Sequence, residues 1–341
     1  MDHKHIDAFD YLRFFAMSAV IFMHVASGPL RSPGGIGWML LNPFVSLAFT
    51  AVPLFFMMSG YLLMTSAKTA EVSTLKARLP RLIVPLVFWS VVACGWEAWR
   101  DRQSLQWLIN KLISMIRGPV AVHFWFMYTL IAMYLISPFL YRCFHNLPND
   151  GRKWLGILLG LILLTSMVSL ALPEKLAVYA SVKPLEELRF FSGHLCSFLI
   201  GWLLGTIERK IPNRWLILTA LAIWGLISAG TWYLTSTSGA YDSSFQTQSG
   251  GFEILLAACL FLLAMQNLKQ SPRFLKFFAP LTFGIYLMHN ILNSMLSHFG
   301  MVPSGFTTTC VKSLVVLAGC TGFVALAGLI KPLRFFTTGN R

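Results

Sequence analysis

Asp10-Tyr-Leu-Arg13-Phe-Phe-Ala-Met-Ser-Ala-Val-Ile-Phe-Met-His24 is the stretch that decides the fold of this chain. An α-helix turns about 100° and rises about 1.5 Å per residue, so Arg13 and His24 lie on one face, about 20° and about 16 Å apart. Asp10 and Met17 share that face. The stretch therefore predicts a membrane-spanning helix with a stripe of ionisable groups, which are costly at membrane depth and indicate function.

The composition is that of a membrane protein. Of the 341 residues, 56% are hydrophobic and only 12% are charged, whereas about a quarter of a soluble domain is charged. Ten apolar segments, each about 20 residues long, suffice to cross a bilayer as helices. We expect an all-α polytopic membrane protein with about ten transmembrane helices, in a single domain over residues 1–341 without a C-terminal extracytoplasmic domain. The segments are residues 9–26, 39–64, 82–99, 123–141, 154–172, 190–207, 215–235, 252–268, 279–299 and 313–333.

The positive charges predict which side of the membrane each connection faces. With the N-terminus inside, the inner connections carry about twice as many Lys and Arg residues as the outer ones, as short cytoplasmic connections do. Both termini are then cytoplasmic. The net charge of +14 is mainly a topology signal, with anionic membrane lipids rather than nucleic acid as the partner. The first segment lacks a small-residue cleavage site, so we expect a retained helix and no signal peptide.

The six cysteines are scattered, mostly inside or at the ends of apolar segments. None forms a Cys-x-x-Cys pair or another spacing typical of a metal site. We therefore expect small apolar packing residues and no metal.

Two connections on the predicted outer side differ from the others. Residues 100–122 carry apolar side chains at helical spacing, which predicts an amphipathic helix in the outer interface. Residues 236–251 hold no Lys or Arg and are rich in hydroxyls and amides, with Tyr241 and Phe245 among them. That connection is either a flexible linker or a lip that contacts a polar acceptor such as a sugar.

Arg13 and His24 each have a structural and a functional interpretation. A histidine on an apolar helix face often bonds a buried carbonyl, and an arginine near a helix end often reaches the headgroups. Asp10 also offers Arg13 a local ion pair at i, i+3. The functional alternative is that His24 accepts a proton and that Arg13 binds phosphates together with Arg78 and Arg81. The positive-inside rule explains Arg78 and Arg81 almost as well.

The second segment combines a helix breaker with small residues. Pro53 predicts a kink. Ser59-Gly60-Tyr61 offers either a polar notch with an accessible backbone or helix packing through small residues.

Two further histidines lie in apolar surroundings. His123 begins the fourth segment beside Trp125 and Phe126. An interfacial aromatic belt explains the two aromatic residues but not the histidine. In the ninth segment, Tyr286 and His289 are three residues apart and share a helix face. A polar pair at that depth needs a partner or a cavity.

These motifs together resemble the acyltransferase-3 family of integral-membrane acyltransferases over essentially the whole chain. The resemblance is carried by Asp10-Tyr-Leu-Arg13 with His24, Val52-Pro-Leu-Phe-Phe-Met-Met-Ser59-Gly60-Tyr61-Leu62, Arg78-x-x-Arg81, His123-x-Trp125-Phe126 and Tyr286-Leu-x-His289. It implies a ten-helix enzyme of the bacterial inner membrane that moves an acetyl or similar acyl group from cytoplasmic acyl-CoA to a cell-envelope carbohydrate. It places the family's arginine and histidine of the first helix on Arg13 and His24, and its paired arginines on Arg78 and Arg81.

We therefore expect acetyl-CoA as the donor and an envelope glycan or lipid-linked sugar as the acceptor. The pantetheine arm would reach along about 16 Å of helix to His24, the general base or the acyl-accepting nucleophile. His123 is expected to position the acceptor or to stabilise the oxyanion. The expected donor-binding residues are Arg13, Arg78, Arg81, Ser59, Gly60 and Tyr61.

Two other functions fit the same polar stripe. A transporter or flippase would use Arg13, His24 and His289 as a proton relay, although no inverted repeat is visible between the halves of the sequence. A structural partner of glycan-assembly enzymes would tolerate alanine at these positions.

Overall fold

The helices of the structure follow the apolar segments of the sequence. This computed structural model describes residues 5–171 and 193–339, and within them it contains helices and no strand. The predicted all-α fold is confirmed. The α-helices are α1 (Asp7–Leu30), α2 (Gly35–Ala48), α3 (Ala51–Met64), α4 (Val72–Arg100), α5 (Leu105–Ser114), α6 (Trp125–Phe144), α7 (Asn149–Ala171), α10 (His194–Gly205), α11 (Asn213–Ser238), α12 (Gly251–Asn267), α13 (Arg273–Phe278), α14 (Thr282–His298), α15 (Phe306–Ala327) and α16 (Lys331–Thr338).

Eight helical stretches of the described residues are long and apolar enough to cross a membrane. They correspond to eight of the ten predicted segments. The other two, residues 190–207 and 252–268, form the shorter apolar helices α10 and α12, and the first of these segments begins outside the described residues. The chain is therefore a multi-pass membrane protein.

The second predicted segment is two helices rather than one kinked rod. α2 ends at Ala48 and α3 begins at Ala51. Pro53 has no N–H to donate to the carbonyl of Phe49, so the break falls four residues before the proline. Leu54, the next residue with an N–H, donates to the carbonyl of Thr50 and continues α3.

The last apolar helix begins and ends earlier in the chain than the predicted segment, residues 313–333. α15 already begins at Phe306, and Lys312 lies inside it, buried, where its Nζ donates to Ser297 Oγ at 2.5 Å. A buried cation with a hydrogen-bond acceptor does not end a helix. Pro332 belongs instead to the first turn of a separate helix, α16, which packs against α4.

The two unusual outer connections both have definite structure. The predicted amphipathic helix is present as α5, and it exposes Leu105 and Ile113. The connection between α11 and α12 buries Phe245 and Gln246, and the Gln246 amide donates to Asn42 Oδ1 at 2.9 Å and to Ser46 Oγ at 2.8 Å. It is therefore packed against α2 and is not a loose linker.

The hydroxyl of Tyr241 fixes this connection further, because it donates to Gln246 Oε1 at 2.5 Å. Burial, with a smaller contribution from Asp242, raises the pKa of Tyr241 to about 12. The hydroxyl therefore stays protonated and remains a donor at any physiological pH.

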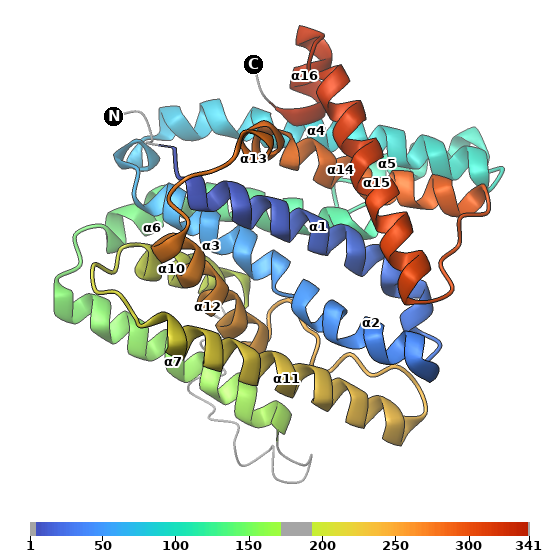
Figure 1. The fold of residues 1–341 in the computed structure, drawn as a ribbon. Coiled ribbons are helices and arrows are strands. Elements are labelled where there is room, and N and C mark those ends of the chain that lie inside the picture. The colour runs from blue at the N-terminus through green and yellow to red at the C-terminus, as the bar shows by residue number, and fades with distance from the viewer. Residues whose placement is uncertain (1–4, 172–192, 340–341) are drawn as a thin grey trace.

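α1 runs through the middle of the bundle, where it packs against α2, α3, α12, α14 and α15 (Figure 1). Ala16, Met17 and Ala26 on this helix are completely buried. The stripe of α1 that carries Arg13 and His24 is thus enclosed by other helices.

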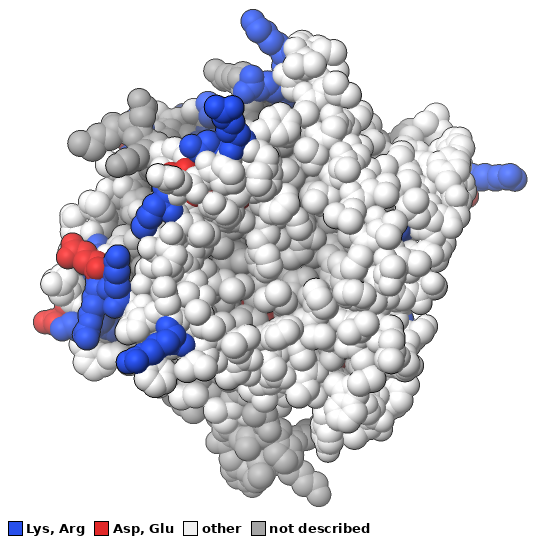
Figure 2. Space-filling view, in the orientation of Figure 1, with Lys and Arg blue, Asp and Glu red and all other residues white. Residues whose placement is uncertain are grey.

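Lys and Arg residues gather along one side of the molecule (Figure 2). On the visible face they lie near α13, α16 and the start of α7, and almost none lies across the middle. Such a distribution is typical of a membrane protein whose cytoplasmic side is basic, and it supports the predicted orientation.

All six cysteines are free thiols, and four of them, Cys94, Cys196, Cys259 and Cys320, are buried. Their contacts are those of small apolar packing residues.

Candidate functional site

Three histidines from distant parts of the chain meet near the predicted outer end of α1. His24 comes from α1, His123 from the short helix Val122–Phe124 that precedes α6, and His289 from α14. The ring centroid of His289 lies 5.1 Å from that of His24 and 5.0 Å from that of His123, and the His24 and His123 centroids are 6.2 Å apart. The structure thus brings together residues that the sequence singled out separately.

Both ring nitrogens of His123 are engaged. Its Nε2–H donates to the carbonyl of Leu287 at 3.2 Å, and its Nδ1 accepts from the amide of Asn290 at 3.4 Å. The hydroxyl of Tyr286 donates to the His123 carbonyl. These three contacts join the start of α6 to α14, so His123 holds the site together and has no nitrogen left for proton transfer.

His24 and His289 each keep a nitrogen available. The Nδ1–H of His289 donates to the carbonyl of Tyr286 at 2.5 Å, which leaves a buried Nε2 without a partner among the described residues. The half-buried ring of His24 forms no hydrogen bond with any residue that the structure describes. A lone pair without a partner in a buried site is what a general base requires.

The inner part of the same α1 face opens into a cavity of about 410 Å³. Arg13, Ser59, Arg81 and Tyr134 are among its polar lining residues. Neither Arg13 nor Arg81 forms an ion pair with any carboxylate of the described chain. Two unpaired guanidinium groups on one cavity make it suited to an anion.

Arg78 stands beside this cavity rather than in its lining. It donates to Thr69 Oγ1 at 3.2 Å. Tyr134 is close enough to interact electrostatically with both Arg78 and Arg13. The three predicted arginines therefore lie in one region, with a tyrosine between them.

The three residues of the predicted notch point to different places. Ser59 lines the Arg13 cavity. Gly60 packs against α10, where a Cβ at this position would lie 1.8 Å from the Phe198 carbonyl oxygen. Tyr61 lines another inner cavity and packs edge-on against Phe9. Only Ser59 therefore faces the proposed donor site, and Gly60 serves helix packing.

A second, much smaller cavity lies at the histidine cluster. His24, His123, Trp125 and Gln248 are among its lining residues. Its volume of about 10 Å³ holds roughly one water molecule. Gln248 belongs to the packed connection between α11 and α12, and its amide lies 3.7 Å from Met23 Sδ, so this connection does reach the site.

The polar stripe of α1 is not one open tunnel. Phe126 and Tyr286 line both cavities and form the wall between them. The residue spacing on α1 placed Arg13 and His24 on one face, but it carried no information about the side chains that other helices insert between them.

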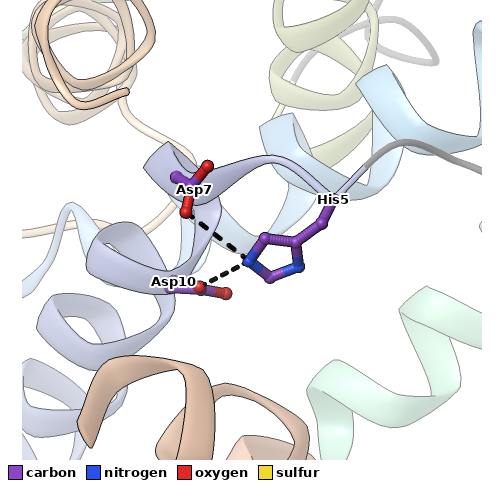
Figure 3. A group of neighbouring side chains, drawn as sticks. All are labelled: His5, Asp7 and Asp10. Atoms are coloured by element: carbon purple, nitrogen blue, oxygen red, sulfur yellow. Dashed lines mark hydrogen bonds and ion pairs between the residues drawn. The ribbon is translucent and has the colours of Figure 1, made fainter. Parts of the chain in front are cut away.

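At the start of α1, Asp7 and Asp10 face the ring of His5 (Figure 3). His5 Nε2 donates to Asp10 Oδ2 at 2.8 Å, and Asp7 Oδ1 accepts from the backbone N–H of Ser271 at 2.8 Å. Asp10 therefore pairs with His5 and not with Arg13, contrary to the local pair that the sequence offered. These bonds fix the beginning of α1 against the segment before α13.

Several residues at the two cavities were not selected from the sequence as functional. They are Phe126, Tyr134, Gln248, Asn290 and Thr338. Tyr134 and Asn290 are polar groups within apolar segments and were therefore detectable. Phe126 was part of the His123-x-Trp125-Phe126 motif but was explained as part of an interfacial aromatic belt, and Gln248 follows no periodic pattern.

Comparison with known proteins identifies the family. The model of the acyltransferase-3 family, described as an acyltransferase domain, matches residues 6–329. This range includes the three histidines, the whole lining of the smaller cavity and all of the larger cavity's lining except Thr338 and Gly339. No curated protein and no solved structure matches the chain significantly.

Proposed function

The chain belongs to the acyltransferase-3 family and is a membrane acyltransferase, and on that premise we propose that it is an O-acetyltransferase. It moves an acetyl group from cytoplasmic acetyl-CoA to a hydroxyl of a cell-envelope carbohydrate in the bacterial inner membrane. The observation that carries this proposal is that α1 places Arg13 at one cavity and His24 at the next. Arg81 of α4 joins Arg13, and within the described chain neither arginine has a carboxylate partner and the His24 ring has no hydrogen bond.

The Arg13 cavity suits the donor. The phosphates of CoA bind Arg13 and Arg81 through the forked N–H donors of the guanidinium groups, with Arg78 nearby as a third cation. Ser59 and Tyr134 add hydroxyl donors on the same cavity. The pantetheine arm then runs outward beside α1 and brings the thioester to the wall formed by Phe126 and Tyr286.

The reaction is acyl transfer with His24 as general base. The acceptor hydroxyl oxygen attacks the thioester carbonyl carbon while His24 takes the hydroxyl proton. The carbon–sulfur bond breaks, and the proton passes from His24 to the sulfur, so CoA leaves as the free thiol. A covalent acyl-histidine on the same ring is the other route, and trapping the acyl group on His24 in enzyme without acceptor distinguishes the two.

The acceptor side is the outer end of the histidine cluster. Gln248, Asn290 and Asn293 are half-buried amides there, and amides recognise sugar hydroxyls. We propose enterobacterial common antigen as the first glycan acceptor to test.

The test is a transfer assay with purified protein, labelled acetyl-CoA and envelope glycan. We expect glycan that carries the label and has gained the mass of an acetyl group, and transfer by His24→Ala that is lower by at least about 100-fold. His145→Ala, at an exposed histidine stacked on Tyr141, is the matched control and should transfer normally. Full activity of folded His24→Ala would refute the assignment.

A further inference from the structure

We propose that the ring of Phe126 sets the length of the transferred acyl group and restricts the donor to acetyl-CoA. This inference rests on the proposed function and concerns one property of it, the choice among acyl donors.

The first support is the position of the ring between the two cavities. Phe126 lines the cavity of about 410 Å³ that holds Arg13 and also the cavity of about 10 Å³ that holds His24. A thioester that comes from the larger cavity must bring its carbonyl carbon to the Phe126 wall to reach His24. The acyl tail beyond that carbon then has only the smaller cavity.

The second support is the size of the smaller cavity. A space that holds roughly one water molecule also accommodates about one methyl group. The acyl tail of acetyl is a methyl group, whereas butyryl adds two methylenes that must displace packed side chains. Steric exclusion of this kind discriminates by about 10- to 200-fold per methylene.

The third support is that other aromatic rings pack around Phe126. The ring centroid of Phe126 lies 4.9 Å from that of Phe56, 5.2 Å from that of Tyr286 and 5.9 Å from that of Phe55. The Tyr286 ring is held by its hydroxyl, which donates to the His123 carbonyl. Phe126 and Tyr286 together bound the space between the two cavities, and a smaller side chain at position 126 enlarges it.

The experiment measures kcat/KM for acetyl-CoA and butyryl-CoA with the full-length purified enzyme and its glycan acceptor. The wild type should prefer acetyl-CoA. Phe126→Ala and the milder Phe126→Leu should raise the butyryl-to-acetyl ratio, by about 10- to 200-fold for the alanine variant. Phe139→Leu is the matched control, because Phe139 lies exposed on the same helix, α6, and lines neither cavity, and its ratio should not change.

A second variant reaches the same space from α3. Val52 lines only the smaller cavity, so Val52→Ala should also favour butyryl-CoA, and it keeps the proposal testable if both Phe126 variants fail to fold. The inference is overturned if the butyryl-to-acetyl ratio is unchanged in active Phe126 variants or in Val52→Ala. In that case acetyl transfer by the wild type still upholds the proposed function. Absence of transfer from any acyl-CoA by the wild type overturns the function itself.

Discussion

The two ends of the α1 stripe differ in how their polar groups are satisfied. At the inner end, Arg13 and Arg81 line an open cavity without a carboxylate partner among the described residues. At the outer end, three imidazoles are packed together, and His123 and His289 are bound to carbonyl groups. A large cavity with guanidinium groups that pair with no described carboxylate suits a large anion, whereas a small cavity with ordered imidazoles suits proton transfer.

The largest effect should come from the outer end. His24→Ala removes the free imidazole, so transfer should fall by about 100- to 10,000-fold, the usual contribution of a general base. Binding of acetyl-CoA should be unchanged, because the donor phosphates bind at the other end. Calorimetry measures donor binding, and the transfer assay measures the rate of acetyl transfer. A loss of donor binding in His24→Ala would mean that donor binding and proton transfer are not separated between the two ends of α1.

The inner end should show the opposite behaviour. Arg81→Gln removes a charged hydrogen-bond donor worth about 1.5 to 3 kcal/mol, so KM for acetyl-CoA should rise roughly 10- to 150-fold with a smaller change in kcat. Arg273→Gln, at an exposed arginine that starts α13 and lies outside the cavity lining, is the control for lost positive charge. Equal effects of the two substitutions would show that net charge, and not the cavity, attracts the donor.

Gly60 tests whether the notch is packing or binding. Gly60→Ala forces a Cβ to within 1.8 Å of the Phe198 carbonyl oxygen, so α3 and α10 must separate and the protein should lose about 1 to 3 kcal/mol of stability. Gly156→Ala is the control, since no atom lies within 4 Å of its added Cβ. Thermal unfolding in detergent checks this, and a lower donor affinity at normal stability would favour the binding interpretation.

The smallest effect is expected at the edge of the outer site. Gln248→Ala removes one neutral hydrogen-bonding group, worth about 0.5 to 1.5 kcal/mol, so KM for the glycan should rise roughly 2- to 12-fold. KM for acetyl-CoA should stay constant. Gln106→Ala on the exposed face of α5 is the control, and a change in the donor KM instead would place Gln248 outside the acceptor path.

The sequence predicted the all-α fold and the shared face of Arg13 and His24, because apolar segment length and helical periodicity are local properties. It did not predict that His123 and His289 meet at His24, since these contacts join residues 99 to 265 positions apart in the sequence. The role of Gly60 depends on Phe198 of a distant helix, and the wall between the cavities depends on Phe126 and Tyr286. Tertiary packing decides each of these, and a single sequence does not show it.

The measurement that tests the central claim most directly uses the purified protein in one orientation in sealed vesicles. Acetyl-CoA is supplied on the side of the Arg13 cavity, and the glycan acceptor is enclosed on the side of His24. The account predicts acetylated glycan on the side opposite the donor, with wild type but not with His24→Ala. Acetylation only when donor and glycan share a side would contradict it.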